Sequence, residues 1–437
     1  MIKIKTIILV LSLSSLTAFS QQPLSLMEAV DIAMQENHDI RIARNNIKIA
    51  ENNASILNSG YLPSLSASGG ISKKNEDTYT DMGGGINRDV KDAITDNYNY
   101  GITMNYRLFD GFGRQNTYKK FKSNYTLVEL QARATIENTL MAVILSYYQV
   151  ANFSSRLKNQ KRTLDISSER YERAKMQFEF GQASTLDLLR SEVDKNNDSI
   201  NYINTNRELQ IARRNFNVLL ARDVKTAFEV DTNVLFKNTV IEDTVMDMAL
   251  QQNVEYLISK QSMDIAQLDT KSLRAGYIPK VDLSGGYSAN NTQSTGGAFL
   301  ASEAYGLNAR ASLSWDLFDG GRTHTQVQNA KIAELNAQEQ TYNQEINLMR
   351  EVSNAFINYE NSIFIMEAEN KNMETNNLNF EYSRGQFVLG QITSIDYRKA
   401  QVDLQESINR FNDAKYTAKI AELQLMKLAG LFMQEVQ

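Results

Sequence analysis

The tetrapeptide Leu108-Phe109-Asp110-Gly111 returns as Leu317-Phe318-Asp319-Gly320, and this duplication decides how the chain is divided. The two copies are 209 residues apart (319 − 110). Two further duplications follow the same order along the chain, which indicates two copies of one structural unit. They pair Phe178–Asp187 with Phe387–Asp396 at the same offset, and Gly60–Pro63 with Gly276–Pro279 at an offset of 216 (276 − 60).

A long helix is expected in the middle of each copy. Between Gly111 and Gly181 the sequence has no proline, and apolar residues recur every seven positions. Such heptads predict helices of about 70 residues, ~105 Å long, packed as in a coiled coil. The recurring residues are Leu157, Leu164, Tyr171 and Phe178 in the first copy, and Met366, Met373, Phe380 and Phe387 in the second.

Shorter helices are expected on either side of each long helix. They are 27–59 and 183–221 in the first copy, and 245–275 and 393–429 in the second. Because two short helices together nearly equal the long one, we expect them to stack end to end beside it. The predicted divisions are 21–222 for the first repeat, 223–244 for an equatorial segment between the repeats, and 245–437 for the second, with tips at 181–184 and 390–393.

Each copy also contains an expected β-hairpin, at 62–109 and 278–318. Tyr98–Leu108 and Tyr305–Leu317 alternate apolar with small polar residues, a period typical of strands. Ten-residue strands with one apolar face match outer-membrane barrel strands. Ser72–Asn97 and Ser288–Ala304 are expected to be surface loops. The aromatic residues expected at the membrane interfaces are Tyr98, Tyr100, Tyr106, Tyr287, Tyr305 and Trp315.

The predicted fold class is mainly α with a transmembrane β-barrel portion. A soluble antiparallel sandwich would show the same alternation, but four strands beside such long helices leave no core to bury them. Four strands cannot close a barrel, and an open edge in lipid leaves backbone groups unsatisfied. Closure therefore requires several copies of the chain. Two copies would give 8 strands filled by side chains, and three would give 12 strands around a lumen.

The first 20 residues have the features of a secretory signal peptide. Lys3 and Lys5 precede a short apolar run, and small residues follow at Ala18 and Ser20. We expect cleavage after Ser20 and an exported protein. Because no cysteine follows that position, we expect no N-terminal lipid anchor.

Composition argues against several classes of function. The chain has no cysteine, only two histidines and a net charge of −5. These features speak against disulfide scaffolds, multi-histidine metal sites and general nucleic-acid binding. His38 and His324 lack companions at catalytic or metal-ligand spacing, so we predict no enzyme activity, no cofactor and no metal. The function classes left open are an exit duct, a structural coiled-coil envelope protein and a diffusion porin.

The duplicated GYLP/GYIP, the duplicated LFDG and the F-x-x-G tips resemble the TolC-like outer-membrane efflux family. The resemblance implies a homotrimer with a 12-stranded barrel and a long periplasmic helical tunnel. It implies an exit duct of a tripartite efflux or type I secretion system in a Gram-negative outer membrane. The implied partners are a periplasmic adaptor, an inner-membrane transporter and outer-membrane lipid, and the implied duct is passive and opened by docking.

The same resemblance implies two sites at the periplasmic end. Asp396, six residues after the tip glycine, stands at the family's mouth constriction, with Asp187 at the matching place in the first copy. Lys399 and Arg190 stand where some members have a second aspartate. Either a ring of Asp396 paired with Lys399 gates the mouth, or the two form an ordinary i,i+3 surface ion pair. The implied adaptor-docking tips are Gly181, Gln182, Ala183, Gly390, Gln391 and Ile392.

Overall fold

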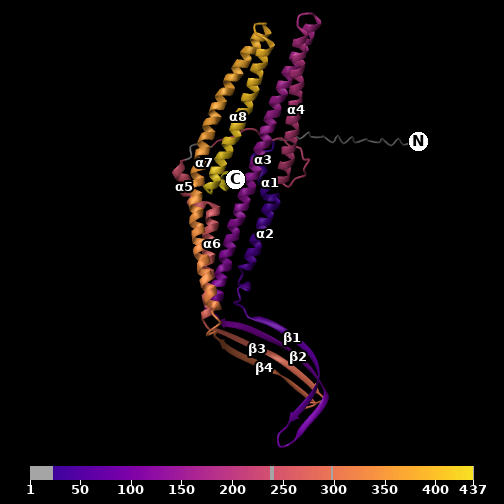
Figure 1. The fold of residues 1–437 in the computed structure, drawn as a ribbon, viewed down its shortest axis with the longest axis vertical. Helices are drawn as coiled ribbons and strands as arrows, with labels where there is room; N and C mark the ends of the chain where they lie inside the picture. The colour runs from indigo at the N-terminus through magenta and orange to yellow at the C-terminus, as the bar shows by residue number, and fades with distance from the viewer. Residues whose placement is uncertain (1–22, 237–240, 297–298, 437) are drawn as a thin grey trace, which may run out of the picture. The chain divides into compact units, whose positions relative to one another are not determined.

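The computed structural model describes residues 23–236, 241–296 and 299–436, so the expected signal peptide at 1–20 lies outside the described residues. The chain is mostly helical, with one four-stranded sheet, as the sequence predicted. It divides into two compact units, whose elements are labelled in Figure 1. Unit 1 comprises Met1–Arg41, Ile136–Met246 and Val352–Gln437, and unit 2 comprises Ile42–Thr135 and Asp247–Glu351.

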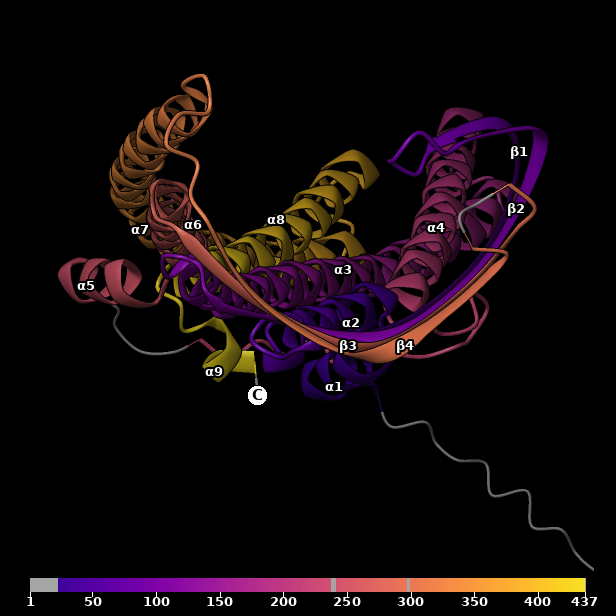
Figure 2. The same ribbon diagram turned by 90° about the horizontal axis from the view of Figure 1, so that it is seen from below.

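The sheet belongs to unit 2 and combines the hairpins of both sequence copies. Its strands are antiparallel and lie in chain order, and Figure 2 shows that the sheet is strongly curved. The pairing of β2 with β3 joins the two hairpins into one surface. The strands are β1 (Ser64–Asp81), β2 (Asn87–Phe109), β3 (Lys280–Ser294) and β4 (Ala301–Ser314).

The predicted surface loops of both hairpins were too long. Within Ser72–Asn97, the ladder of β1 and β2 continues to the pair Asp81 and Asn87, so only residues 82–86 connect the strands. Within Ser288–Ala304, β3 continues to Ser294 and β4 begins at Ala301. These strand ends are polar on both faces, so the backbone ladder continues where the alternation of side chains stops.

The pairing register gives the sheet one apolar face. Tyr100 pairs with Gly69 and Ala289, Ile102 with Ala67 and Tyr287, and Met104 with Leu65 and Gly285. On β4 these rows continue with Tyr305, Leu307 and Ala309. Because successive side chains of a strand point to opposite faces, the other face carries the serines, threonines and asparagines between them. That face also holds the ion pair of Arg107 with Asp282, at 2.8 Å.

Both long helices start directly after the sheet. α3 (Gly113–Glu179) and α7 (Arg322–Val388) each have 67 residues, close to the predicted length. The Asp110 carboxylate accepts the backbone N–H of Arg114 at 3.0 Å, and the Asp319 carboxylate accepts that of Thr323 at 2.9 Å. The aspartate of each LFDG motif therefore closes the first turn of its helix.

The expected single helices before the hairpins are each interrupted by an asparagine. Asn37 separates two helices in the first copy, and Asn253 separates two in the second. The Asn37 side chain accepts the backbone N–H of Asp39 at 2.9 Å, and Asn253 accepts that of Tyr256 at 3.0 Å. Both asparagines thus end one helix and cap the next. The helices are α1 (Leu26–Glu36), α2 (His38–Asn53), α5 (Glu242–Gln252) and α6 (Val254–Arg274), and the short 3₁₀ turns η1 (Ile56–Asn58) and η2 (Ala275–Tyr277) precede the strands.

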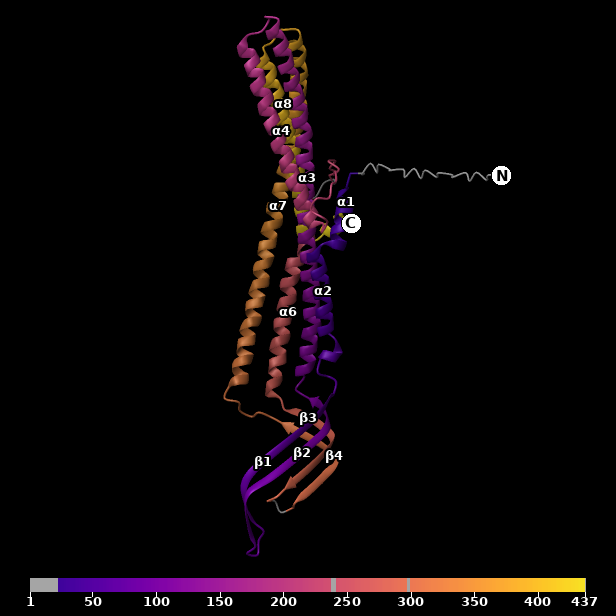
Figure 3. The ribbon, with the colours of Figure 1, turned by 90° about the vertical axis from the view of Figure 1, so that its right-hand side faces the viewer.

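Unit 1 contains two helical hairpins and the main hydrophobic core. The hairpins pair the last part of α3 with α4 (Thr185–Leu219), and the last part of α7 with α8 (Ser394–Leu428). Figure 3 shows α4 and α8 beside the end of α3. A short helix, α9 (Phe432–Val436), closes the chain. The largest fully buried core side chains include Tyr147, Phe216, Leu140, Ile144 and Phe432.

Residues 223–236 of the predicted equatorial segment pack on this core as irregular chain. Phe228 and Val230 are buried in the core cluster, and Val230 forms an isolated bridge with Leu24. The Tyr147 hydroxyl donates to the carbonyls of Leu24 at 2.9 Å and Asp231 at 3.1 Å. One buried tyrosine therefore fixes both the start of the described chain and this segment.

Candidate functional site

The tips of the two helical hairpins are tight glycine turns. Gly181 and Gly390 have φ of +71° and +72°, a left-handed conformation that glycine adopts without a Cβ penalty. The Gly181 N–H donates to Phe178 at 3.0 Å, and the Gly390 N–H donates to Phe387 at 3.1 Å. The tip residues Gln182 and Gln391 are exposed, whereas Ala183 and Ile392 are half-buried. The duplicated glycines thus end one helix and reverse the chain.

The candidate aperture residues Asp396 and Asp187 sit in the first turns of α8 and α4. The Asp396 carboxylate accepts the Thr393 hydroxyl at 2.6 Å and the Thr393 backbone N–H at 3.3 Å. Asp187 likewise accepts the Ser184 hydroxyl at 2.7 Å. Both aspartates are exposed, and both stabilise the start of a helix.

The predicted pairing of Asp396 with Lys399 was wrong. The Lys399 ammonium instead bonds the Asp403 carboxylate at 2.8 Å, and this hydrogen bond and charge raise the pKa of Lys399. The reason is local, because the Asp396 carboxylate turns back to its capping partner while Lys399 reaches one turn forward on α8. Arg190, the matching residue of the first copy, lines a cleft with Asp187.

That cleft, of about 530 Å³, lies between the two hairpins near their tips. Its apolar lining includes Leu189, Val193 and Ile395. Arg173 lies over the ring of Phe387, 5.9 Å from its centroid. The cleft therefore brings together part of the first tip, Gln182 and Ala183, and the aperture candidates Asp187 and Arg190, with cationic and apolar groups on its walls.

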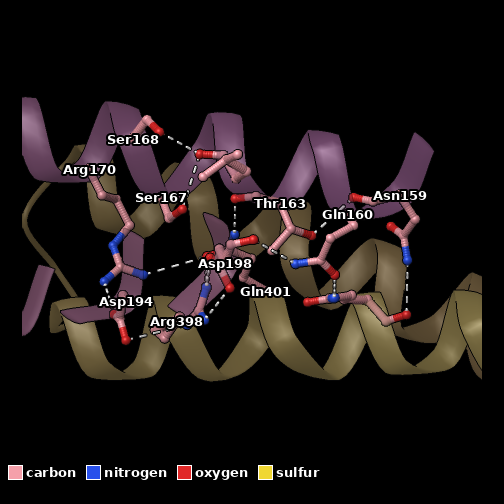
Figure 4. A network of polar contacts seen from close by, with 12 residues as sticks. Asn159, Gln160, Thr163, Ser167, Ser168, Arg170, Asp194, Asp198, Arg398 and Gln401 are labelled. Carbon is pink, nitrogen blue, oxygen red and sulfur yellow. Dashed lines mark hydrogen bonds and ion pairs between the residues drawn. The ribbon is translucent and has the colours of Figure 1, made fainter. Parts of the chain in front are cut away.

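A buried charge network lies on the same hairpins (Figure 4). Arg398 on α8 holds both carboxylate oxygens of Asp198 on α4, at 2.7 and 2.9 Å. Arg170 on α3 pairs with Asp194 at 2.5 Å, and Arg398 is 3.8 Å from the same carboxylate. Asp198 is only 1% exposed. Two arginines and two aspartates thus join three helices with their charges balanced.

Amide groups extend the network along the bundle. The Gln401 side chain donates to the Thr163 carbonyl at 3.1 Å, and the Gln160 side chain donates to the Asp198 carbonyl at 3.3 Å. Gln405 donates to Gln160. The buried positions of α3 here are Gln160, Thr163, Ser167 and Arg170, at heptad spacing. This seam of the coiled coil is therefore polar, although the heptad predicted apolar contacts.

The network keeps Arg398 charged inside the bundle. Burial opposes the positive charge, but the hydrogen bond and charge of Asp198 and the charge of Asp194 outweigh it and raise the pKa of Arg398. Removing either partner would leave a buried charge without compensation, which is far more costly than losing a surface pair. No duplicated motif indicates this network, because Arg398 corresponds to Leu189 in the first copy (398 − 209).

The six predicted membrane-interface aromatics lie in and beside the sheet. The register puts five tyrosines on the apolar face. Tyr287 lies in the same row as Ile102, midway along the apolar rows, and Tyr106 lies nearer the helices. Trp315 follows β4, and its indole N–H donates to the Tyr277 carbonyl at 3.1 Å. The remaining three, Tyr98, Tyr100 and Tyr305, lie in the two rows farthest from the helices.

The described part of the chain shows neither a cluster of metal-ligating side chains nor a membrane-spanning helix. Among residues 23–236, 241–296 and 299–436, no group of three or more His, Asp or Glu side chains is placed to hold a metal ion. In the same residues, no helix has a stretch long and apolar enough to cross a membrane.

Comparisons with known proteins give results that are consistent with one another. The family model described as "Outer membrane efflux protein" matches residues 29–222 and 245–431. The probable outer membrane lipoprotein SilC of Salmonella typhimurium is 21% identical over 411 residues, 91% of this chain and 84% of that protein. The outer membrane protein TolC of Vibrio cholerae is 22% identical over 319 residues, 70% of each chain. The Campylobacter jejuni CmeC outer membrane channel has a similar fold, with a TM-score of 0.77, 17% identity and coverage of 93% and 86%.

Proposed function

The chain belongs to the outer membrane efflux protein family, as its duplicated motifs predicted, and we propose that three copies form one exit duct. The protein resides in the outer membrane of a Gram-negative bacterium. One observation carries the proposal of a shared duct: the sheet is apolar on one face, polar on the other, and unpaired at both edges. Within the described residues, β1 and β4 each pair with a single neighbour.

The open edges of the sheet favour assembly of more than one copy. A sheet edge in lipid leaves backbone N–H and C=O groups without partners, so β1 of one copy would pair with β4 of the next. Three four-stranded sheets give a 12-stranded barrel, wide enough for a water-filled bore. The apolar rows span nine residues of β2, from Tyr98 to Tyr106 (106 − 98 + 1), which fits the length of a tilted membrane strand.

The two faces of the sheet suit lipid outside and water inside. Tyr100, Ile102 and Met104 would face lipid, and the polar residues that alternate with them would line the bore. The ion pair of Arg107 and Asp282 lies on this polar face and would contact the conducted solution. The proposed duct is passive, and transport energy would come from an inner-membrane transporter. A structural coiled-coil envelope protein would have no use for a sheet of this kind.

The helical tips would be the docking surface for a periplasmic adaptor. Gly181-Gln182-Ala183 and Gly390-Gln391-Ile392 end the two hairpins, and Gln182 and Ala183 also line the cleft of unit 1. In the closed duct, α7 and α8 would tilt towards the central axis and narrow the periplasmic mouth. Arg398 would hold α8 against α4 in this state. Docking would release that contact and open the duct.

We retain Asp396 as an aperture carboxylate, now without Lys399 as its partner. Three exposed copies of Asp396 around the mouth would attract cations. Asp396→Asn removes the charge but keeps an oxygen that can accept the capping bonds from Thr393. We expect the variant to show weaker cation preference than wild type in planar bilayers. Equal cation preference in wild type and Asp396→Asn would remove this assignment.

Edge cross-linking tests the shared barrel. The chain has no cysteine, so a cysteine placed on β1 and another on β4 would be the only thiols present. A small set of position pairs along the two edges should include one that oxidises to covalent trimers in outer-membrane preparations. Disulfides formed only within single chains would show a sheet that closes on itself, and the proposal would fail.

A further inference from the structure

A groove on the apolar face of the sheet has no role in conducting solutes. It has a volume of about 510 Å³, within the usual range for ligand sites. Its floor is the pair Met104 and Gly285, which are directly opposite each other on β2 and β3. Leu283 and Tyr106 form the next row, and the connection Tyr61-Leu62-Pro63 covers one end. Because Gly285 has no side chain, the row is hollow at this point.

At the side of the groove nearest the helices, two basic residues lie over tyrosine rings. The Tyr61 ring meets Tyr118 edge to face, with centroids 6.0 Å apart. The Lys122 ammonium lies 4.6 Å from the Tyr118 centroid, and the Arg114 guanidinium lies 5.4 Å from the Tyr61 centroid. Arg114 is already bound to Asp110, whereas Lys122 is exposed and has no carboxylate partner in the described residues. Lys122 is therefore available to an anion at this end.

The position of the groove in the sheet indicates which class of ligand it binds. It lies between the two middle strands, away from the β1 and β4 edges at which another copy would pair. It occupies the rows of the apolar face nearest the helices, so in the proposed duct it faces the leaflet on the periplasmic side. Lys122 is linked to the groove through Tyr118 and Tyr61, and an apolar groove with an exposed cation beyond it matches a lipid with an anionic headgroup.

We propose that this groove is a binding site for one anionic phospholipid of the outer membrane, a conclusion that rests on the proposed membrane function. One acyl chain lies over Met104, Leu283 and Gly285, and the headgroup phosphate is held by Lys122. Tyr61 and Tyr118 lie between the two regions, where amphipathic rings are favoured in membranes. The bound lipid fills the hollow row and fixes the junction of the sheet with α3.

Native mass spectrometry of the detergent-purified assembly tests the site. Phosphatidylglycerol should bind more tightly than phosphatidylcholine with the same acyl chains. Lys122→Gln should weaken phosphatidylglycerol binding about fivefold, the effect of one basic residue at an anionic surface, and weaken phosphatidylcholine binding less, because the choline cation offsets the charge of its phosphate. Gly285→Leu fills the groove and should weaken both lipids. An added Cβ at Gly285 meets only ordinary contact, 3.6 Å from the Asn308 carbonyl, so the backbone can accept it.

Two matched controls separate the site from general effects. Ala309→Leu adds similar bulk in the same row on β4, outside the groove. Lys195→Gln removes a lysine that lies 4.5 Å from the Tyr171 ring in unit 1, an equivalent cation–π pair. Both controls should bind lipid like wild type. Equal binding of the two lipids by wild type, or unchanged phosphatidylglycerol binding in Lys122→Gln, would overturn the proposal.

Channel recordings distinguish this inference from the function on which it rests. If wild type forms channels in planar bilayers but shows no preference for phosphatidylglycerol, only the lipid site is refuted. If wild type does not insert into bilayers, the exit duct is refuted and the lipid site with it.

Discussion

Replacing Arg398 by alanine should loosen α8 from the rest of unit 1. The guanidinium holds both oxygens of the Asp198 carboxylate, at 2.7 and 2.9 Å, and links α8 to α4. In the variant, Asp198 keeps its negative charge at a position that is 1% exposed. Removing one partner of a buried ion pair costs about 3–5 kcal/mol, mostly because the other charge is left without compensation.

We expect a cost near the lower end of that range. The Arg398 side chain is 19% exposed, so water already reaches part of the pair and weakens it. A cost of about 3 kcal/mol corresponds to a factor of roughly 150 in the opening equilibrium of α8. Hydrogen exchange of the α8 amides can be measured by mass spectrometry. The amides should exchange faster in the variant than in wild type by this factor.

Arg410 provides the matched control on the same helix. Its side chain is 48% exposed and lies 3.3 Å from Glu369, so the pair is a surface ion pair worth about 0–1 kcal/mol. Arg410→Ala should therefore change α8 exchange less than about fivefold. The double variant Arg398→Met with Asp198→Leu should recover most of the lost protection, because it removes both charges. Equal exchange in Arg398→Ala and Arg410→Ala would refute this reasoning.

Three further predictions concern single residues. Gly390→Ala should destabilise its tip by about 1 kcal/mol because φ is +72°, whereas Gly385→Ala, within α7, should stabilise by a similar amount; thermal unfolding of both variants checks the signs. Burial raises the pKa of Tyr147 to about 12, so its contribution is complete below pH 10 and is lost as pH rises towards 12. Alkaline unfolding curves should accordingly be less steep for Tyr147→Phe than for wild type. Asn253→Ala should cost about 1 kcal/mol through the lost cap of α6, and faster exchange at the start of that helix would report it.

The features predictable from sequence are those set by local chemistry. Gly181 and Gly390 take a conformation that disfavours other residues, and Asp110 and Asp319 cap the helices that follow them. Because these requirements are the same in both copies, the same residues recur in the sequence and can be recognised there. The length of each long helix could be predicted from the same motifs, because LFDG lies just before its start and the tip glycine lies just after its end.

The true strand lengths could not be read from the alternation of side chains. Beyond the apolar rows, Lys73 pairs with Asp96 and Thr78 with Val90, so both faces contain polar residues. Backbone hydrogen bonds continue there without a hydrophobic pattern. The interruptions at Asn37 and Asn253 were accessible in principle, because both are capping residues separated by 216 positions, the offset of the GY-P motifs.

The charge network could not be predicted from the sequence, because it depends on how the helices pack against one another. The apolar heptad of α3 suggested that Leu164 and Tyr171 face the core, but Thr163 and Arg170 are the buried positions. Asp194 and Asp198 are spaced like residues on any solvated helix face. Only the packing of α8 against α4 brings Arg398 to them, and no duplicated motif marks that contact.

The mass of the protein extracted from the outer membrane in mild detergent tests the central claim most directly. In the part of the chain that the structure describes, the sheet has an apolar face, a polar face and two unpaired edges, so the account predicts a complex with three times the mass of one mature chain. A stable particle with the mass of a single chain, its sheet closed on itself, would contradict it.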